Sequence, residues 1–122
     1  RFSSVESDPD AVVCARENLA LRQLPGKLSA GDAGAWAIPK RVDCVVLDPP
    51  RQGAREVVAT IAEARTKSVV YVSCDMATFA RDAIALCASG YELDHLEVAD
   101  LFPQTSHAET IARFRRAGRA SA

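Results

Sequence analysis

A cysteine at a strand–helix junction is the first feature of this sequence that could carry out chemistry. Residues 69–82 read VVYVSCDMATFARD, where an apolar, strand-like run ends at Ser73-Cys74-Asp75 and a helical pattern follows. A thiolate is a strong nucleophile, and a helix N-terminus stabilises an anion. A lone cysteine is also a common small core residue. On position alone, Cys74 is therefore as consistent with burial as with catalysis.

The other three cysteines favour a structural interpretation. Cys14, Cys44 and Cys87 fall within helix or strand patterns and are expected in the core. No two cysteines form a C-x-x-C pair, so the sequence supports neither a disulfide framework nor a zinc site.

A second motif, Asp48-Pro49-Pro50-Arg51, follows the apolar run VDCVVL. Successive prolines end a strand and stiffen the turn, and D/N-P-P at this place is typical of enzymes that hold a planar base near S-adenosylmethionine. A simple strand-terminating turn is the alternative. Enzymes that methylate base amines usually carry an aromatic residue next, whereas this chain has Arg51. A uracil carbon, by contrast, needs covalent activation, which Cys74 could provide.

Further acids and one histidine complete the candidate set. Glu6 and Asp32 follow predicted strands, and open parallel sheets bind ligands at the carboxyl ends of their strands. Glu6 suits a ribose, whose hydroxyl protons a carboxylate can accept, and Asp32 suits an adenine edge or a loop amide. A general base would come from His107 or Glu109. Taken singly, these residues also fit helix caps, solvated loops or edge-strand charges.

Alternating strand and helix patterns position these residues. The predicted order is strand 2–6, helix 9–23, strand 27–30, strand 42–47 buried on both faces, helix 54–65, strand 68–73, helix 76–88, and strands 92–100 and 109–115. Asp8 and Pro9 form a helix N-cap and first-turn pair. The residues predicted to face inward are Val12, Val13, Ala15, Leu19, Ala20, Val57, Val58, Ile61, Phe79, Ala83, Ile84 and Cys87. The alternation predicts an α/β, Rossmann-like sheet, mostly parallel, closed by a C-terminal antiparallel two-strand unit.

Bulk composition indicates a globular protein. Of the 122 residues, 48% are hydrophobic and 25% charged, with a net charge of −1, so no overall field calls for a nucleic-acid partner, although a local patch could bind one. We expect no membrane partner and a cytoplasmic location, because no apolar run approaches membrane-spanning length. The chain starts with Arg rather than Met, which suggests a fragment of a longer domain.

Together these motifs resemble the catalytic domain of the RNA 5-methyluridine methyltransferases. The resemblance covers nearly the whole chain in the family's order, and the DPPR-x-G and SC-[ND]-x-x-T-x-x-RD elements are specific. The matching segments are Val5-Glu6, residues 46–53, 71–75, 80–82, 101–105 and 107–110.

The resemblance implies an S-adenosylmethionine-dependent enzyme that methylates carbon 5 of a uridine in rRNA or tRNA. It implies Cys74 as the nucleophile that adds to carbon 6 of a flipped uracil and Glu109 as the proton acceptor at carbon 5. Glu6, Asp32 and Asp48 match cofactor positions. Asp48, Pro49 and Arg51 would contact the base. No metal site is implied.

Two departures from the family pattern qualify this expectation. Met76 stands where the family usually has proline, which would loosen the turn after the nucleophile. The family's Gly-rich loop and RNA-binding domain are not found in residues 1–122, and Gly31 and Gly34 do not replace the loop. We therefore expect the 122 residues alone to be the C-terminal portion of a catalytic domain, to bind cofactor weakly and to lack activity. Their oligomeric state stays open, self-association included.

Two other functions stay open at this point. Another Rossmann-like methyltransferase, acting on a base amine or a small molecule, would share Glu6 and Asp48 but not need Cys74. A non-catalytic RNA-binding module would use the arginines at 113, 115, 116 and 119. The sequence does not specify which RNA or which uridine is the target.

Overall fold

A computed structural model describes residues 2–101, 103–104 and 108–118. The chain divides into two compact units, Arg1–Ala37 and Ile38–Ala122, and each is described by itself. No helix in the described ranges is long and apolar enough to cross a membrane.

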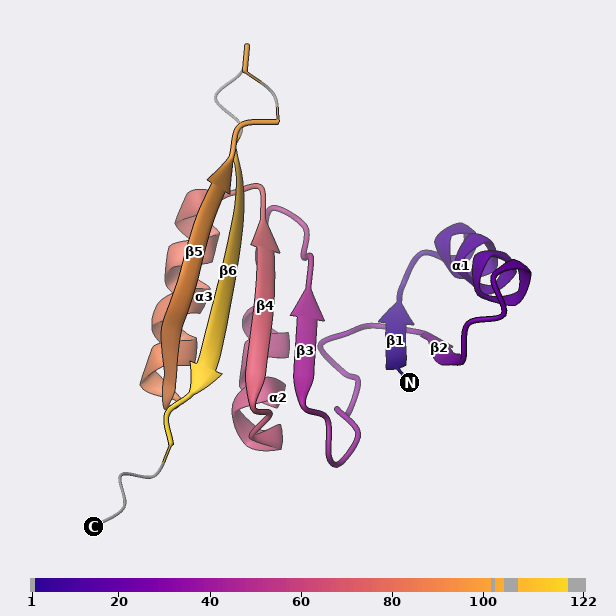
Figure 1. Cartoon of the computed structure of the whole chain (residues 1–122), viewed down its shortest axis with the longest axis horizontal. Coiled ribbons are helices and arrows are strands. Elements are labelled where there is room, and N and C mark those ends of the chain that lie inside the picture. The colour runs from indigo at the N-terminus through magenta and orange to yellow at the C-terminus, as the bar shows by residue number, and fades with distance from the viewer. Residues whose placement is uncertain (1, 102, 105–107, 119–122) are drawn as a thin grey trace. The chain divides into compact units, whose positions relative to one another are not determined.

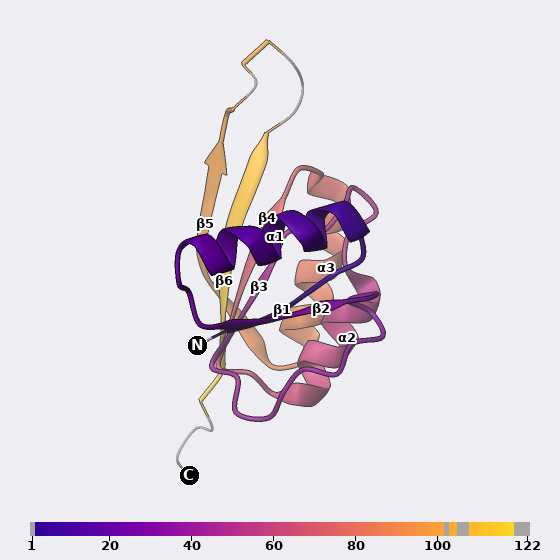
Figure 2. The ribbon, with the colours of Figure 1, turned by 90° about the vertical axis from the view of Figure 1, so that its right-hand side faces the viewer.

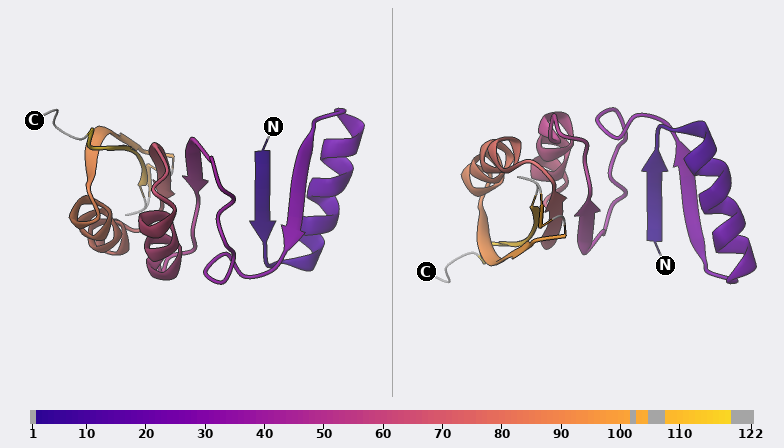
Figure 3. Two further views of the ribbon diagram at one scale, coloured as in Figure 1. Left: turned by 90° about the horizontal axis from the view of Figure 1, so that it is seen from below. Right: turned by 90° about the horizontal axis from the view of Figure 1, so that it is seen from above.

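The first unit is one helix on two parallel strands. β1 (Phe2–Glu6) pairs with β2 (Gly26–Ala30), and α1 (Pro9–Leu21) connects them (Figure 3). The Asp8 carboxylate accepts hydrogen bonds from the amides of Asp10 and Ala11, which confirms the predicted N-cap.

The predicted inner face of α1 is only partly correct. Val12 is buried, whereas Val13 is 51% exposed and Ala20 is also exposed. A helix that packs on only two strands has few partner atoms to cover a wide apolar face, so the buried stripe narrows to one residue.

The second unit is a four-stranded sheet in the order β3-β4-β6-β5. Its strands are β3 (Cys44–Leu47), β4 (Ser68–Ser73), β5 (Tyr91–Ala99) and β6 (Glu109–Arg116). β3 and β4 are parallel, and β6 runs antiparallel to both β4 and β5. Three of the four strands therefore share one direction (Figure 1), which confirms the predicted α/β sheet with its C-terminal antiparallel unit.

Both helices of this unit, α2 (Arg55–Ala64) and α3 (Met76–Ala88), lie on the same face of the sheet (Figures 1 and 2). The predicted bounds of α3 are correct, and Gly90 follows its C-cap with a φ of +89°. The core lies between helices and sheet, and its largest fully buried side chains include Tyr71, Tyr91 and Phe114.

Several predictions of burial in this unit are wrong. β3 is not buried on both faces, since Val46 is 69% exposed and Cys44 is exposed. The helices cover only one face of the sheet, and Val46 lies among the side chains that the described residues leave uncovered. Cys14 and Cys87 are likewise exposed rather than core residues.

The inner face of α3 also differs from the prediction. Ile84 is 70% exposed, whereas Phe79, Asp82 and Leu86 are buried. These three residues recur at intervals of three and four, which places them on one side of a helix. A carboxylate thus occupies the middle of a buried stripe.

Candidate active site

The predicted nucleophile, Cys74, and the predicted base, Glu109, lie at the same end of two neighbouring strands. Ser73 pairs with Thr110 at the end of the antiparallel β4–β6 ladder. Cys74 comes directly after Ser73, and Glu109 comes directly before Thr110. Because the strands run in opposite directions, both residues lie at the same end of the sheet. Both are half-buried, so each is within reach of a ligand there.

Local hydrogen bonds fix the backbone on both sides of Cys74. The Asp75 amide donates to Ser73 Oγ (3.2 Å), and Ser73 Oγ donates to the Asp75 carbonyl (3.0 Å). Asp75 then caps α3, because its Oδ1 accepts the Thr78 amide (2.8 Å) and the Thr78 hydroxyl (3.0 Å). These bonds from Thr78, the amide first, lower the pKa of Asp75. Cys74 therefore stands one residue before a well-formed helix cap.

A contact from Met76 crosses to the strand that carries Glu109. The Thr110 hydroxyl donates to Met76 Sδ at 2.8 Å. The prediction that Met76, in place of the usual proline, loosens this turn stays a prediction. The contact links the start of α3 to β6.

The loop after β3 lies at the same end of the sheet. β3 and β4 are parallel, so Asp48 and Cys74 both follow carboxyl ends of neighbouring strands. Asp48 and Arg51 are exposed and Pro49 is half-buried. The turn closes through a hydrogen bond from the Gly53 amide to the Pro50 carbonyl (2.8 Å). The loop is thus compact and presents polar groups at the same end of the sheet as the cysteine.

Glu6 and Asp32 lie at the carboxyl end of the first unit's small sheet. The Gly31 amide donates to the Glu6 carbonyl (2.9 Å), which joins the two strand ends. Glu6 is half-buried and its Oε1 accepts the Asp8 amide (2.8 Å). Asp32 is exposed and its Oδ1 accepts the Gly34 amide (2.9 Å). In each carboxylate these bonds use one oxygen, and the chemistry of the pair fits a ligand that offers hydroxyl or amine protons.

The roles of these residues stay predictions. The structure brings Cys74, Glu109 and Asp48 together in the second unit, and Glu6 and Asp32 together in the first. His107, the other candidate base, lies outside the described residues.

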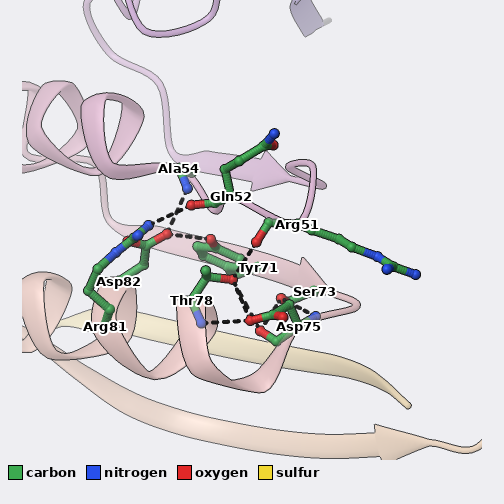
Figure 4. A network of polar contacts seen from close by, with 9 residues as sticks. All are labelled: Arg51, Gln52, Ala54, Tyr71, Ser73, Asp75, Thr78, Arg81 and Asp82. Carbon is green, nitrogen blue, oxygen red and sulfur yellow. Dashed lines mark hydrogen bonds and ion pairs between the residues drawn. The ribbon is translucent and has the colours of Figure 1, made fainter. Parts of the chain in front are cut away.

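A buried polar network is the part of this region that sequence reasoning missed (Figure 4). Asp82 is 1% exposed, and its Oδ2 accepts the Ala54 amide (2.7 Å) and the Tyr71 hydroxyl (2.7 Å). Arg81 donates from Nε to Asp82 Oδ1 (2.9 Å). A charged residue at the centre of the apolar stripe of α3 was the signal that could have revealed it.

These contacts govern the charge states of the network. Burial would raise the pKa of Asp82, but the bonds from Ala54, Tyr71 and Arg81 together lower it. For Tyr71, burial and then the hydrogen bond to Asp82 raise the pKa well above its usual range. At neutral pH the pair is therefore an ionised Asp82 carboxylate that accepts a hydrogen bond from the neutral Tyr71 phenol.

Comparison with known proteins identifies the closely related sequences. No family model matches the chain. The 23S rRNA (uracil-1939-C5)-methyltransferase RlmD of Pseudomonas entomophila is 48% identical over 87 residues, which cover 71% of this chain and 19% of the relative. RlmD of Shewanella sp. strain MR-4 is 41% identical over 119 residues, or 93% of this chain and 26% of the relative. The chain thus spans about a fifth to a quarter of the length of these relatives.

The same group of enzymes provides a structural match. The tRNA (uracil-54, C5)-methyltransferase of Pyrococcus abyssi, solved with S-adenosyl-L-homocysteine, superposes with a TM-score of 0.83 at 30% identity. The match covers 92% of this chain and 28% of that one. By sequence and by fold, the chain belongs to the family of RNA uracil-C5 methyltransferases.

Proposed function

We propose that the protein containing this chain transfers a methyl group from S-adenosylmethionine to carbon 5 of a uridine in rRNA or tRNA. The observation that carries the proposal is the placement of Cys74 and Glu109 at the same end of two neighbouring antiparallel strands, beside the Asp48-Pro49-Pro50-Arg51 loop. A nucleophile and a base that act on the two adjacent carbons of one ring must both reach that ring, which residues at the same end of neighbouring strands can do.

The chemistry assigns one step to each residue. The Cys74 thiolate adds to carbon 6 of the uracil, and the electron pair of the ring double bond moves to make carbon 5 nucleophilic. Carbon 5 takes up the methyl group of S-adenosylmethionine, whose methyl–sulfur bond breaks so that S-adenosylhomocysteine leaves. Glu109 then removes the proton from carbon 5, the double bond re-forms, and the thiolate leaves carbon 6. The thiolate is regenerated, and the proton ends on the Glu109 carboxylate.

Other residues would bind the two substrates. Glu6 and Asp32 carry carboxylate oxygens suited to the ribose hydroxyls and the adenine amine of the methyl donor. Asp48 is suited to the donor as well and helps to orient the base, with Pro49 providing a flat apolar contact. Arg51 brings a cation for the RNA. The target base must leave its stack, as in other base-modifying enzymes.

An RNA that contains 5-fluorouridine tests this proposal. Fluorine at carbon 5 cannot be removed as a proton, so the covalent adduct should persist. The protein at its full natural length should form a complex with this RNA that survives denaturing electrophoresis, and peptide mass spectrometry should place the RNA on Cys74. Cys74→Ser should form none, whereas the exposed-cysteine control Cys87→Ser should match the unchanged protein.

Two results would contradict the proposal. One is the absence of an adduct on the unchanged protein while uridine methylation proceeds. The other is methylation that persists in Cys74→Ala, which would support an amine-directed or small-molecule methyltransferase instead. Salt-dependent RNA binding without any methyl transfer would favour a binding module.

A further inference from the structure

Asp82 joins three separate parts of the second unit. Its donors are the Ala54 amide, which ends the loop after β3, the Tyr71 hydroxyl of β4, and Arg81 of α3. We infer that Asp82, Tyr71 and Arg81 are positioning residues for the attack of Cys74 on uracil. This inference rests on the proposed function. The three residues form a clasp that sets the place of loop 48–54 relative to Cys74.

A second set of bonds extends the clasp along the loop. Arg81 Nη2 donates to the Gln52 carbonyl (2.9 Å), and the Thr78 hydroxyl lies 3.0 Å from the Arg51 carbonyl, which shares the one hydroxyl proton with Asp75. The same Thr78 hydroxyl lies 3.0 Å from Oδ1 of Asp75, the residue after Cys74. Figure 4 shows these contacts converging from α3 on the loop. Consecutive loop carbonyls are therefore held by the helix whose cap follows the nucleophile.

Gly53 shows how closely the loop approaches the clasp. Its φ is +81°, and a Cβ built there would lie 2.4 Å from Arg81 Nη2 and 2.6 Å from Asp82 Oδ2. These distances are far inside van der Waals contact, so a side chain at position 53 would force the ends of the Arg81 and Asp82 side chains to shift. The loop backbone thus lies directly against Arg81 and Asp82.

Stability alone does not account for this arrangement. A buried carboxylate is costly to desolvate, and buried polar networks are weak evidence of net stabilisation. The network does provide a fixed geometry between loop 48–54 and Cys74, which must both contact the same base. A displacement of about 1 Å at a reacting centre can cost about 100-fold in rate. We therefore expect a loss in the rate of attack rather than in RNA binding.

The experiment measures the rate of adduct formation with 5-fluorouridine RNA, using the protein at its full natural length. Asp82→Asn removes the charge, and Arg81→Lys keeps the charge but cannot span both Asp82 and the Gln52 carbonyl. We expect each variant to form the Cys74 adduct roughly 10- to 100-fold more slowly. The Kd for the same RNA should change by less than about 3-fold, because the clasp sets the geometry of the reacting groups rather than the strength of RNA binding.

Thr66→Val is the matched control for lost stability. Thr66 is 2% exposed, its Oγ1 lies 3.1 Å from the Tyr91 hydroxyl, and it precedes the opposite end of β4 from Cys74. Its removal should lower Tm without slowing adduct formation. If Asp82→Asn does not fold, as judged by circular dichroism, Tyr71→Phe removes a single donor and keeps the ring, and its adduct rate should still fall.

The outcomes separate the clasp from the proposed function. No adduct on the unchanged protein contradicts the proposed function and the positioning role with it. An adduct that forms at the unchanged rate in Asp82→Asn contradicts the clasp alone. Equal slowing in Thr66→Val and Asp82→Asn at matched Tm would also overturn the clasp, because it would reduce the effect to stability.

Discussion

At the scale of single residues, Glu109 is the group whose role is easiest to isolate. It opens β6, half-buried, next to the Thr110–Ser73 pair. Glu109→Gln keeps the shape of the side chain but cannot accept a proton at neutral pH. We expect kcat to fall by about 10²- to 10⁴-fold, the usual contribution of a general base. Ordinary uridine RNA should then stay attached to Cys74, with one methyl group added, in denaturing gels and mass spectra.

Glu97→Gln on the neighbouring strand β5 is the control for this prediction. The Glu97 side chain is 65% exposed and lies on the same two-strand unit, so its loss should leave turnover unchanged. Normal turnover by Glu109→Gln would remove Glu109 from the mechanism and return attention to His107.

Single residues also show what the sequence could and could not predict. Cys74 and Glu109 are visible because the family motif fixes their neighbours. Asp82 belongs to the same motif, yet its importance comes from the amide of Ala54 and the phenol of Tyr71, residues 28 and 11 positions away. Contacts of this kind depend on how α3 packs, and a local pattern does not contain them.

At the scale of elements, turn chemistry predicted boundaries better than periodicity predicted burial. Asp8-Pro9 marks the start of α1, and Gly90 marks the end of α3. Burial failed at Val46 and Ile84 because an apolar side chain is buried only where another element covers it. Boundaries are local properties, whereas burial belongs to the packing of the whole unit.

The fit of Gly53 beneath α3 gives a prediction at this scale. Gly53→Ala should destabilise the chain through two effects, a left-handed backbone that costs an alanine about 1–2 kcal/mol and the contact with Arg81 and Asp82. Gly90→Ala is the matched control, because its φ is +89° but its Cβ would meet nothing within 4 Å. Urea unfolding should show a larger loss for Gly53→Ala. Equal losses would mean that the loop moves aside freely.

At the scale of the whole molecule, the two units differ in how much core each contains. The buried hydrophobic cluster, from Ala54 to Phe114, belongs entirely to the second unit. Among residues 2–37 of the first unit, by contrast, one hydrophobic residue is buried, Val12. Local stability follows buried apolar contact, so the two units should open with different free energies.

This difference predicts weak binding of the methyl donor by the 122-residue chain. Glu6 and Asp32 lie in the first unit, where Val12 is the one buried apolar side chain in residues 2–37 and leaves little free energy to hold them in place. Hydrogen exchange should be fast for the amides of β1 and β2 and slow for those of β4 and β6. Titration calorimetry with S-adenosyl-L-homocysteine should give a Kd of about 1 mM or weaker, near −4 kcal/mol. The protein at its full natural length is the control and should bind more tightly. A micromolar Kd for the 122 residues, with protected amides in β1, would show that the first unit is ordered enough to hold the ligand by itself.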